Sequence, residues 1–211
     1  MAGTPLRRGD ADPHVLAHVG RYVADVAGPP LSPGEQAAAL GRLREMLYWN
    51  TWESLGEAAA EWTRAWGDAA ARLAPAGPVP CYGDGRLAPH EWLRAADGRL
   101  VKVDCVGHDA DHTAVGRQPV AWDVAGALAE WGLDDAAAGP LLGAFEAAGG
   151  PPVPPPLLTF YRMAYAAFRV GMGSMCADMS GHDSDEQARL RAAAGSYTRE
   201  LARLIECDLP R

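Results

Sequence analysis

Hydrophobic positions recur at helical spacing over most of the chain. A short amphipathic helix is predicted over 15–26, and a second helix begins near Ser32, where a glutamate three residues later completes a capping-box pattern, and runs toward Trp49. Trp62 and Trp66 lie one helical turn apart, so both are expected in the core. Apolar residues at the same spacing predict further helices over 53–73, 121–131, 135–148, 157–179 and 185–207.

The pattern changes in the middle of the chain, where short apolar runs replace the helical period. Runs at 79–82, 91–94 and 100–103 indicate short strands, and the turn residues Asp97-Gly98 join the last two into a hairpin. The proline-rich stretch 151–156 is expected to form a stiff extended connection. These patterns together predict an α+β fold that is predominantly helical and carries a small β hairpin.

The same patterns suggest a division of the chain into two parts. Residues 1–34 are interpreted as an N-terminal extension with one short helix, because a Pro-Pro and Ser-Pro-Gly break follows them. Residues 35–211 are interpreted as one domain. It comprises a helical pair at 35–74, a loop-rich hairpin segment at 79–126 and a helical C-terminal part at 127–211.

Composition narrows the possible functions. The 211 residues carry a formal net charge of −8, which disfavours general binding to nucleic acid. No uncharged apolar stretch is long enough to span a bilayer, so no membrane association is expected. The four cysteines show no C-x-x-C spacing and nothing in the sequence indicates secretion, so a cytoplasmic protein without disulfides or a zinc knuckle is expected.

Candidate chemistry is concentrated between residues 82 and 127, where three aspartates stand beside short apolar or glycine-containing segments. Asp84 lies in a Gly-Asp-Gly loop that could aim its carboxylate at a substrate. Asp104 ends a β-type run, a position that suits a ligand of Mg²⁺. Asp123 stands at a predicted helix start, where a negative charge is favourable for structural reasons alone.

The order of these segments is informative. Tyr82-Gly83-Asp84, the hairpin ending at Asp104, and Ala121-Trp122-Asp123-Val124-Ala125 resemble the large lobe of the aminoglycoside phosphotransferase and choline kinase-like family, which is related to protein kinases. The resemblance implies that Asp84 is the catalytic aspartate that orients or deprotonates the acceptor hydroxyl. It also implies that Asp104 binds Mg²⁺ and that Asp123 braces the catalytic loop. Mg²⁺ with ATP would then be the cofactor, and a nucleotide and a small-molecule hydroxyl compound the binding partners.

The chain departs from the family pattern at several positions. Tyr82 replaces the family histidine, and Glu91 aligns with the metal-holding asparagine when Pro89 is matched to the family's loop proline, so Glu91 becomes the second expected metal ligand. Lys102 is the one lysine among 19 basic residues, and no lysine precedes Asp84. The segments before Asp84 are predicted helices, so the chain resembles a large lobe with no recognisable small lobe.

Other polar residues near these segments keep two interpretations. Lys102 lies on the same face of the hairpin as Asp104, where it either pairs with an acid of the site or is an ordinary surface lysine. His90 is either an acid, base or acceptor contact or a surface histidine. The run containing His108, Asp111 and His112 either contacts substrate or a second metal ion, or is a solvated polar loop.

Three functions remain open from the sequence. The first is a phosphotransferase that moves the γ-phosphoryl group of Mg-ATP to a small-molecule hydroxyl, with a separate small lobe or protein partner completing the site. The alternative is a kinase-like binding or regulatory subunit without turnover, which the absence of a lysine before Asp84 favours. A metal-dependent hydrolase built on the same acids and on His108 or His112 is the third.

Overall fold

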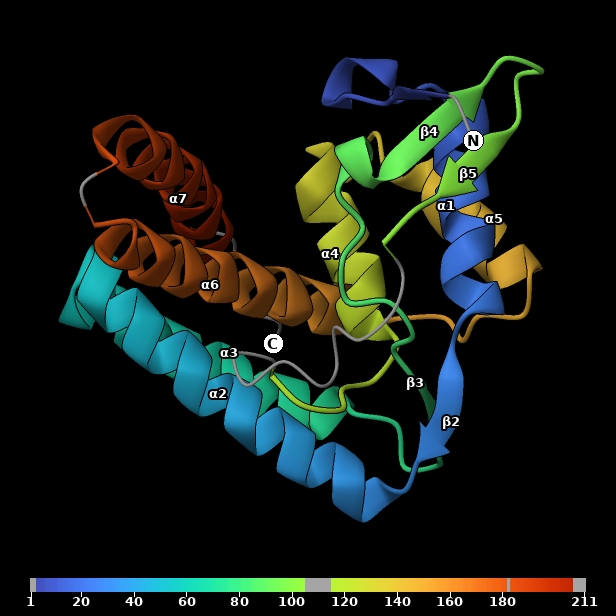
Figure 1. Cartoon of the computed structure of the whole chain (residues 1–211). Helices are drawn as coiled ribbons and strands as arrows, with labels where there is room; N and C mark the ends of the chain where they lie inside the picture. The colour runs from blue at the N-terminus through green and yellow to red at the C-terminus, as the bar shows by residue number, and fades with distance from the viewer. Residues whose placement is uncertain (1–2, 105–114, 182, 207–211) are drawn as a thin grey trace. The chain divides into compact units, whose positions relative to one another are not determined.

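The computed structural model describes residues 3–104, 115–181 and 183–206 of the chain (Figure 1). Its backbone separates into two compact units, each built from two stretches of sequence. Unit 1 comprises Met1–Gly34 and Pro75–Val153, and unit 2 comprises Glu35–Ala74 and Pro154–Arg211. The segment 1–34 therefore belongs to the same unit as the hairpin and Asp84, whereas the boundary expected after residue 34 stays a prediction.

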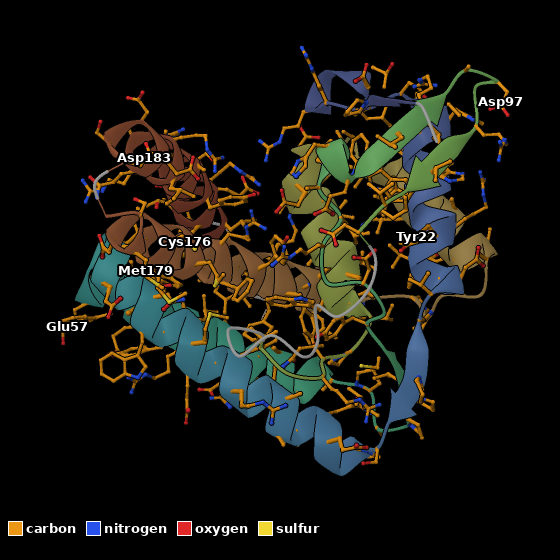
Figure 2. The ribbon with its side chains drawn as sticks, viewed as in Figure 1. Tyr22, Glu57, Asp97, Cys176, Met179 and Asp183 are labelled. Carbon is orange, nitrogen blue, oxygen red and sulfur yellow. The ribbon has the colours of Figure 1, made fainter. Side chains whose placement is uncertain are left out.

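In its described residues, unit 1 combines two small antiparallel sheets with three α-helices and two short 3₁₀ helices. One sheet has the strand order β1-β4-β5 and the other pairs β2 with β3. The elements of unit 1 are β1 (Gly3–Pro5), η1 (Arg8–Asp10), α1 (Pro13–Asp25), β2 (Gly28–Leu31), β3 (Val79–Cys81), η2 (Pro89–Glu91), β4 (Trp92–Ala95), β5 (Leu100–Lys102), α4 (Ala121–Trp131) and α5 (Gly139–Ala147). The expected hairpin is confirmed as β4–β5, with Asp97 at its tip (Figure 2).

The hairpin extends by one hydrogen bond beyond its strands. Trp92 lies opposite Lys102 in the register of β4 and β5, and the Val103 N–H donates to the Glu91 carbonyl at 2.8 Å. Because of this register, Lys102 on one strand lies beside the residue that precedes Trp92 on the other. Two residues that the sequence separates by eleven positions, Glu91 and Lys102, are thereby brought together.

Helix α1 fastens the N-terminal segment to the rest of unit 1. It packs on α5 and, less extensively, on α4. Its approach to α5 is so close that a Cβ built on Gly20 would lie 2.1 Å from the Leu141 carbonyl oxygen, so only glycine fits there. Helix α4 is buried along its whole length, and its bounds are the predicted ones.

Unit 2 is helical throughout its described part. It contains α2 (Pro33–Leu55), whose first two residues belong to unit 1, α3 (Glu57–Leu73), α6 (Pro155–Met179) and α7 (Ser184–Ile205). Helices α6 and α7 form the main contact, and α3 packs on both. Within the α6–α7 contact, the buried Arg162 guanidinium donates to Glu200 at 3.0 Å. The predicted helices of this unit are confirmed, with a break between α2 and α3.

Two expectations about unit 2 are wrong in part. Trp66 is in the core, but Trp62, one helical turn earlier, is half exposed. The proline-rich connection is also shorter than predicted, since Pro155 and Pro156 form the first turn of α6, where a missing backbone N–H costs nothing. In the described part of the chain, no helix combines the length and apolar character needed to cross a lipid bilayer.

Candidate functional site

The site is built around the turn Gly83-Asp84-Gly85, which follows β3. Asp123, in the first turn of α4, accepts three backbone hydrogen bonds from this turn. Its Oδ2 receives the N–H groups of Gly83 and Asp84 at 3.0 and 3.1 Å, and its Oδ1 receives that of Gly85 at 2.8 Å. The carboxylate of Asp123 therefore holds the backbone on both sides of Asp84, which is the geometry expected of a brace.

Neighbouring backbone contacts fix the same turn to α4 and to α1. The N–H of Tyr82 donates to the Gln118 carbonyl, and that of Val120 donates to the Pro80 carbonyl, so β3 is held against the start of α4. On the other side, a Cβ on Gly83 would lie 1.9 Å from the Val26 carbonyl oxygen. Gly83 is therefore required for the turn to pass this closely beneath the end of α1.

Burial acts strongly on the Asp123 carboxyl. Removal from water raises its pKa from 3.8 to about 6, and the nearby Asp84 charge acts in the same direction. The three backbone N–H donors oppose this shift because they stabilise the ionised form. Asp123 is thus an acid that the fold keeps in an environment unfavourable to its charged form, close to a second acid.

Asp84 is fully enclosed, and three groups surround its carboxylate. Its Oδ2 accepts a hydrogen bond from the Tyr22 hydroxyl at 2.6 Å and lies 3.1 Å from the Lys102 ammonium. Its Oδ1 accepts from the Arg86 backbone N–H at 3.1 Å. The Asp84 side chain has no exposed surface and that of Lys102 only 3%. These contacts bring a base, a hydroxyl and a cation together at one buried point.

Lys102 contacts a second buried acid as well. Its Nζ lies 3.2 Å from Glu91 Oε2, whose side chain is 10% exposed. The same Nζ donates to the Val103 carbonyl at 2.9 Å and approaches the Asp104 carbonyl at 3.4 Å. Of the two interpretations of Lys102, pairing with acids of the site is confirmed. We refer to Asp84, Glu91 and Lys102 together as the buried charge cluster.

Tyr22 is a site residue that sequence reasoning missed. It projects from α1 (labelled in Figure 2), and its ring makes an edge-to-face contact with Trp92, with ring centroids 5.1 Å apart. Trp92 is fully buried in the hairpin, so it fixes the Tyr22 ring and aims the hydroxyl at Asp84. The sequence signal that could have identified Tyr22 is its hydroxyl group beside the mostly apolar buried face of α1.

The remaining predicted residues lie in different surroundings. His90 is exposed on η2. Among the described residues, its ring is not one of the partners found for the buried charge cluster. Asp104 follows β5, is exposed, and has a left-handed backbone with φ of 55°. His108, Asp111 and His112 lie outside the described residues, so their predicted roles stay predictions.

The residues expected to hold Mg²⁺ do not assemble a metal site within the described ranges. No group of three or more histidine, cysteine, aspartate or glutamate side chains with the spacing of a metal site occurs in 3–104, 115–181 and 183–206. The carboxylate of Glu91 faces the ammonium of Lys102, which supplies the positive charge that a metal ion would supply. Glu91 is thus paired with a cation of the chain itself, and the predicted roles of Glu91 and Asp104 as Mg²⁺ ligands stay predictions.

Comparison with known proteins places this geometry in context. No protein-family model and no curated protein matches the chain. Among solved structures, choline kinase LicA from Streptococcus pneumoniae is 13% identical with a TM-score of 0.58, over 94% of this chain and 68% of that one. Two structures of glucosamine kinase, one in complex with glucosamine, ADP and inorganic phosphate, are 24% and 23% identical with TM-scores of 0.41 and 0.42. The chain spans about half of their length, 49% in each case.

The likeness to choline kinase concerns the fold, because the sequences share few residues. The helical architecture and the small hairpin agree with the mainly helical α+β fold that the sequence predicted. The chain therefore has an α+β, mainly helical, kinase-like fold.

Proposed function

We propose that the protein transfers a phosphoryl group from a nucleoside triphosphate to a hydroxyl group of a small molecule, with Asp84 as the residue that orients and deprotonates this hydroxyl. One observation carries the proposal. The backbone on both sides of Asp84 is held by Asp123, while its carboxylate is enclosed with Tyr22, Lys102 and Glu91.

Burying these charges lowers the stability of the fold, so their presence indicates a functional role. Buried carboxylates lose their hydration, and Asp84, Glu91 and Asp123 present three of them with one ammonium, Lys102, beside two of the three. Apolar residues of similar size would usually fold at least as stably. A base held rigidly beside a cation is instead what phosphoryl transfer requires, because that reaction depends on positioning and on charge stabilisation.

The proposed step uses the residues as they are placed. The acceptor hydroxyl takes the place of one present neighbour of Asp84 Oδ2, and Asp84 accepts its proton as the oxygen bonds to the γ-phosphorus. The bond from this phosphorus to the bridging oxygen breaks, and the nucleoside diphosphate leaves with that oxygen. Of Tyr22 and Lys102, the neighbour that stays in contact with Asp84 Oδ2 holds the carboxylate in place during the transfer.

A second candidate is a kinase-like binding module without turnover. Its supporting observation is that the Asp84 carboxylate is covered on one side by the Tyr22 hydroxyl and the Lys102 ammonium. Lys102 is also the chain's one lysine, so no other lysine is present to neutralise a triphosphate. A protein partner that completes the site belongs to this candidate and to a two-component enzyme alike.

A transfer assay separates the two candidates. The protein is incubated with ATP, Mg²⁺ in the buffer, and hydroxyl-bearing amines and amino sugars, and phosphorylated products are detected by mass spectrometry. We expect a product with the wild type, a rate at least about 100-fold lower with Asp84→Asn, and an unchanged rate with Asp97→Asn. Asp97→Asn is the matched control because it removes one carboxylate from the exposed hairpin tip. Equal rates in wild type and Asp84→Asn would refute the role of Asp84, and acceptor binding without product would favour the module.

A further inference from the structure

The surroundings of the Lys102 ammonium have the composition of a cation site. Four oxygen atoms lie within 3.4 Å of Nζ: the carboxylate oxygens Asp84 Oδ2 at 3.1 Å and Glu91 Oε2 at 3.2 Å, and the backbone carbonyl oxygens of Val103 and Asp104 at 2.9 and 3.4 Å. Two carboxylates with two carbonyls are a typical oxygen set for a divalent ion such as Mg²⁺, Ca²⁺ or Mn²⁺. Here a side chain of the protein itself occupies the centre of the set.

We propose that Lys102 is a built-in replacement for a metal ion, so that the pair Asp84–Glu91 shares the ammonium of the chain and binds no divalent cation. The burial of the three side chains supports this role. Their exposed fractions are 0% for Asp84, 3% for Lys102 and 10% for Glu91, so solvent cations have little access to the two carboxylates.

The state of Glu91 adds an independent observation. Within the described residues its buried Oε2 accepts no hydrogen bond of acceptable geometry, so its polar contact is the charge pairing with Lys102. A buried carboxylate oxygen of this kind needs a positive partner. The hairpin supplies that partner through its register, because Lys102 lies opposite Trp92 and Glu91 precedes Trp92.

The replacement has a chemical consequence for the site. The ammonium is attached to the chain, so it carries one positive charge and cannot leave the site. A divalent ion carries two positive charges and exchanges with ions in the solvent. The ammonium therefore stays beside Asp84 and Glu91 at any concentration of free metal ion, and it offsets one of their two negative charges. This inference concerns the charge of the buried cluster and holds whether or not the protein transfers a phosphoryl group.

Manganese binding tests the inference, with the paramagnetic signal of free Mn²⁺ as the readout. In the wild-type chain, Mn²⁺ affinity is compared with that of Glu91→Gln. We expect the two affinities to agree within about twofold, because Glu91 is no ligand, whereas loss of a ligand or its direct support typically costs about 10–100-fold. A wild-type site that Glu91→Gln weakens tenfold would overturn the proposal.

The complementary test removes the ammonium. Lys102→Met keeps most of the side-chain volume and leaves the four oxygens facing each other, so we expect a new Mn²⁺ site that the double variant Lys102→Met/Glu91→Gln lacks. The midpoint temperature of thermal unfolding of Lys102→Met should then rise on addition of Mn²⁺, and that of the double variant should stay unchanged. A folded Lys102→Met protein without a new site would contradict the proposal. If Lys102→Met fails to fold, the comparison of wild type with Glu91→Gln still decides the question.

Discussion

The Tyr22 hydroxyl donates a 2.6 Å hydrogen bond to Oδ2 of Asp84, and the two residues are 62 positions apart in the chain. Through this bond, helix α1 of the N-terminal segment becomes part of the site. The bond is short, as expected when a hydroxyl donates to an ionised carboxylate. The N-terminal segment thus contributes directly to the arrangement of Asp84, in addition to packing beside it.

Removing this hydroxyl should lower stability measurably. Tyr22→Phe keeps the ring contact with Trp92 but leaves one oxygen of Asp84 with a weaker set of partners, and we expect a loss of about 1–3 kcal/mol in the free energy of unfolding. Urea titration followed by circular dichroism measures it. Tyr48→Phe is the control, because the Tyr48 hydroxyl bonds to Glu61 in an exposed position, and its loss should cost less than about 0.5 kcal/mol. Equal effects of both substitutions would contradict the account.

The raised pKa of Asp123 predicts a dependence of stability on pH. Because the folded protein holds the Asp123 proton up to about pH 6, whereas the unfolded chain releases it near pH 3.8, the contribution of Asp123 to stability falls as pH rises between these values. The total fall is about 3 kcal/mol for a shift of this size. Above pH 6 the contribution is constant.

The measurement is the free energy of unfolding between pH 4 and pH 7 for wild type and Asp123→Asn. The variant should lose stability overall, since an amide presents one acceptor oxygen to three N–H donors, and it should also lose the component that declines with pH. An unchanged pH profile in Asp123→Asn would show that another group titrates.

Gly83 provides a steric test of the site. A methyl group at this position would overlap the Val26 carbonyl oxygen, so Gly83→Ala should displace the turn that carries Asp84 or the end of α1. We expect a loss of about 2 kcal/mol or more in unfolding free energy. Gly9→Ala is the control within the same unit, because a Cβ there meets no atom within 4 Å. A neutral Gly83→Ala variant would mean that the turn and α1 are less closely packed than the structure has them.

Several elements could be predicted because their signals are local. Helix α4 was predicted at both ends, since its apolar run stops at Gly132, which adopts a left-handed backbone with φ of 67°. The hairpin β4–β5 was also predicted, because two apolar runs flank an Asp-Gly turn. The order of Asp84, Asp104 and Asp123 directed attention to the turn that Asp123 holds by three hydrogen bonds, whereas the catalytic and metal-binding roles stay predictions.

Other features depend on contacts that no local pattern carries. Strands β1 and β2 contain glycine and proline and show no alternation, and they form because β4 and β3 offer backbone partners. The environment of Lys102 depends on the hairpin register, so the sequence left both interpretations open. Trp62 has the helical spacing of a core residue, yet it is half exposed, whereas Trp66 one turn later is buried, so the spacing alone did not show where the buried face of α3 ends.

The central claim is that the buried charge cluster serves chemistry and is not needed for stability. The neutral triple variant Asp84→Asn/Glu91→Gln/Lys102→Met tests it by combining unfolding free energy with the transfer assay. Replacing all charges together leaves no unpaired ion, and we expect a stability within about 1 kcal/mol of wild type or higher, together with complete loss of phosphoryl transfer. A loss of several kcal/mol, or transfer at the wild-type rate, would contradict the account.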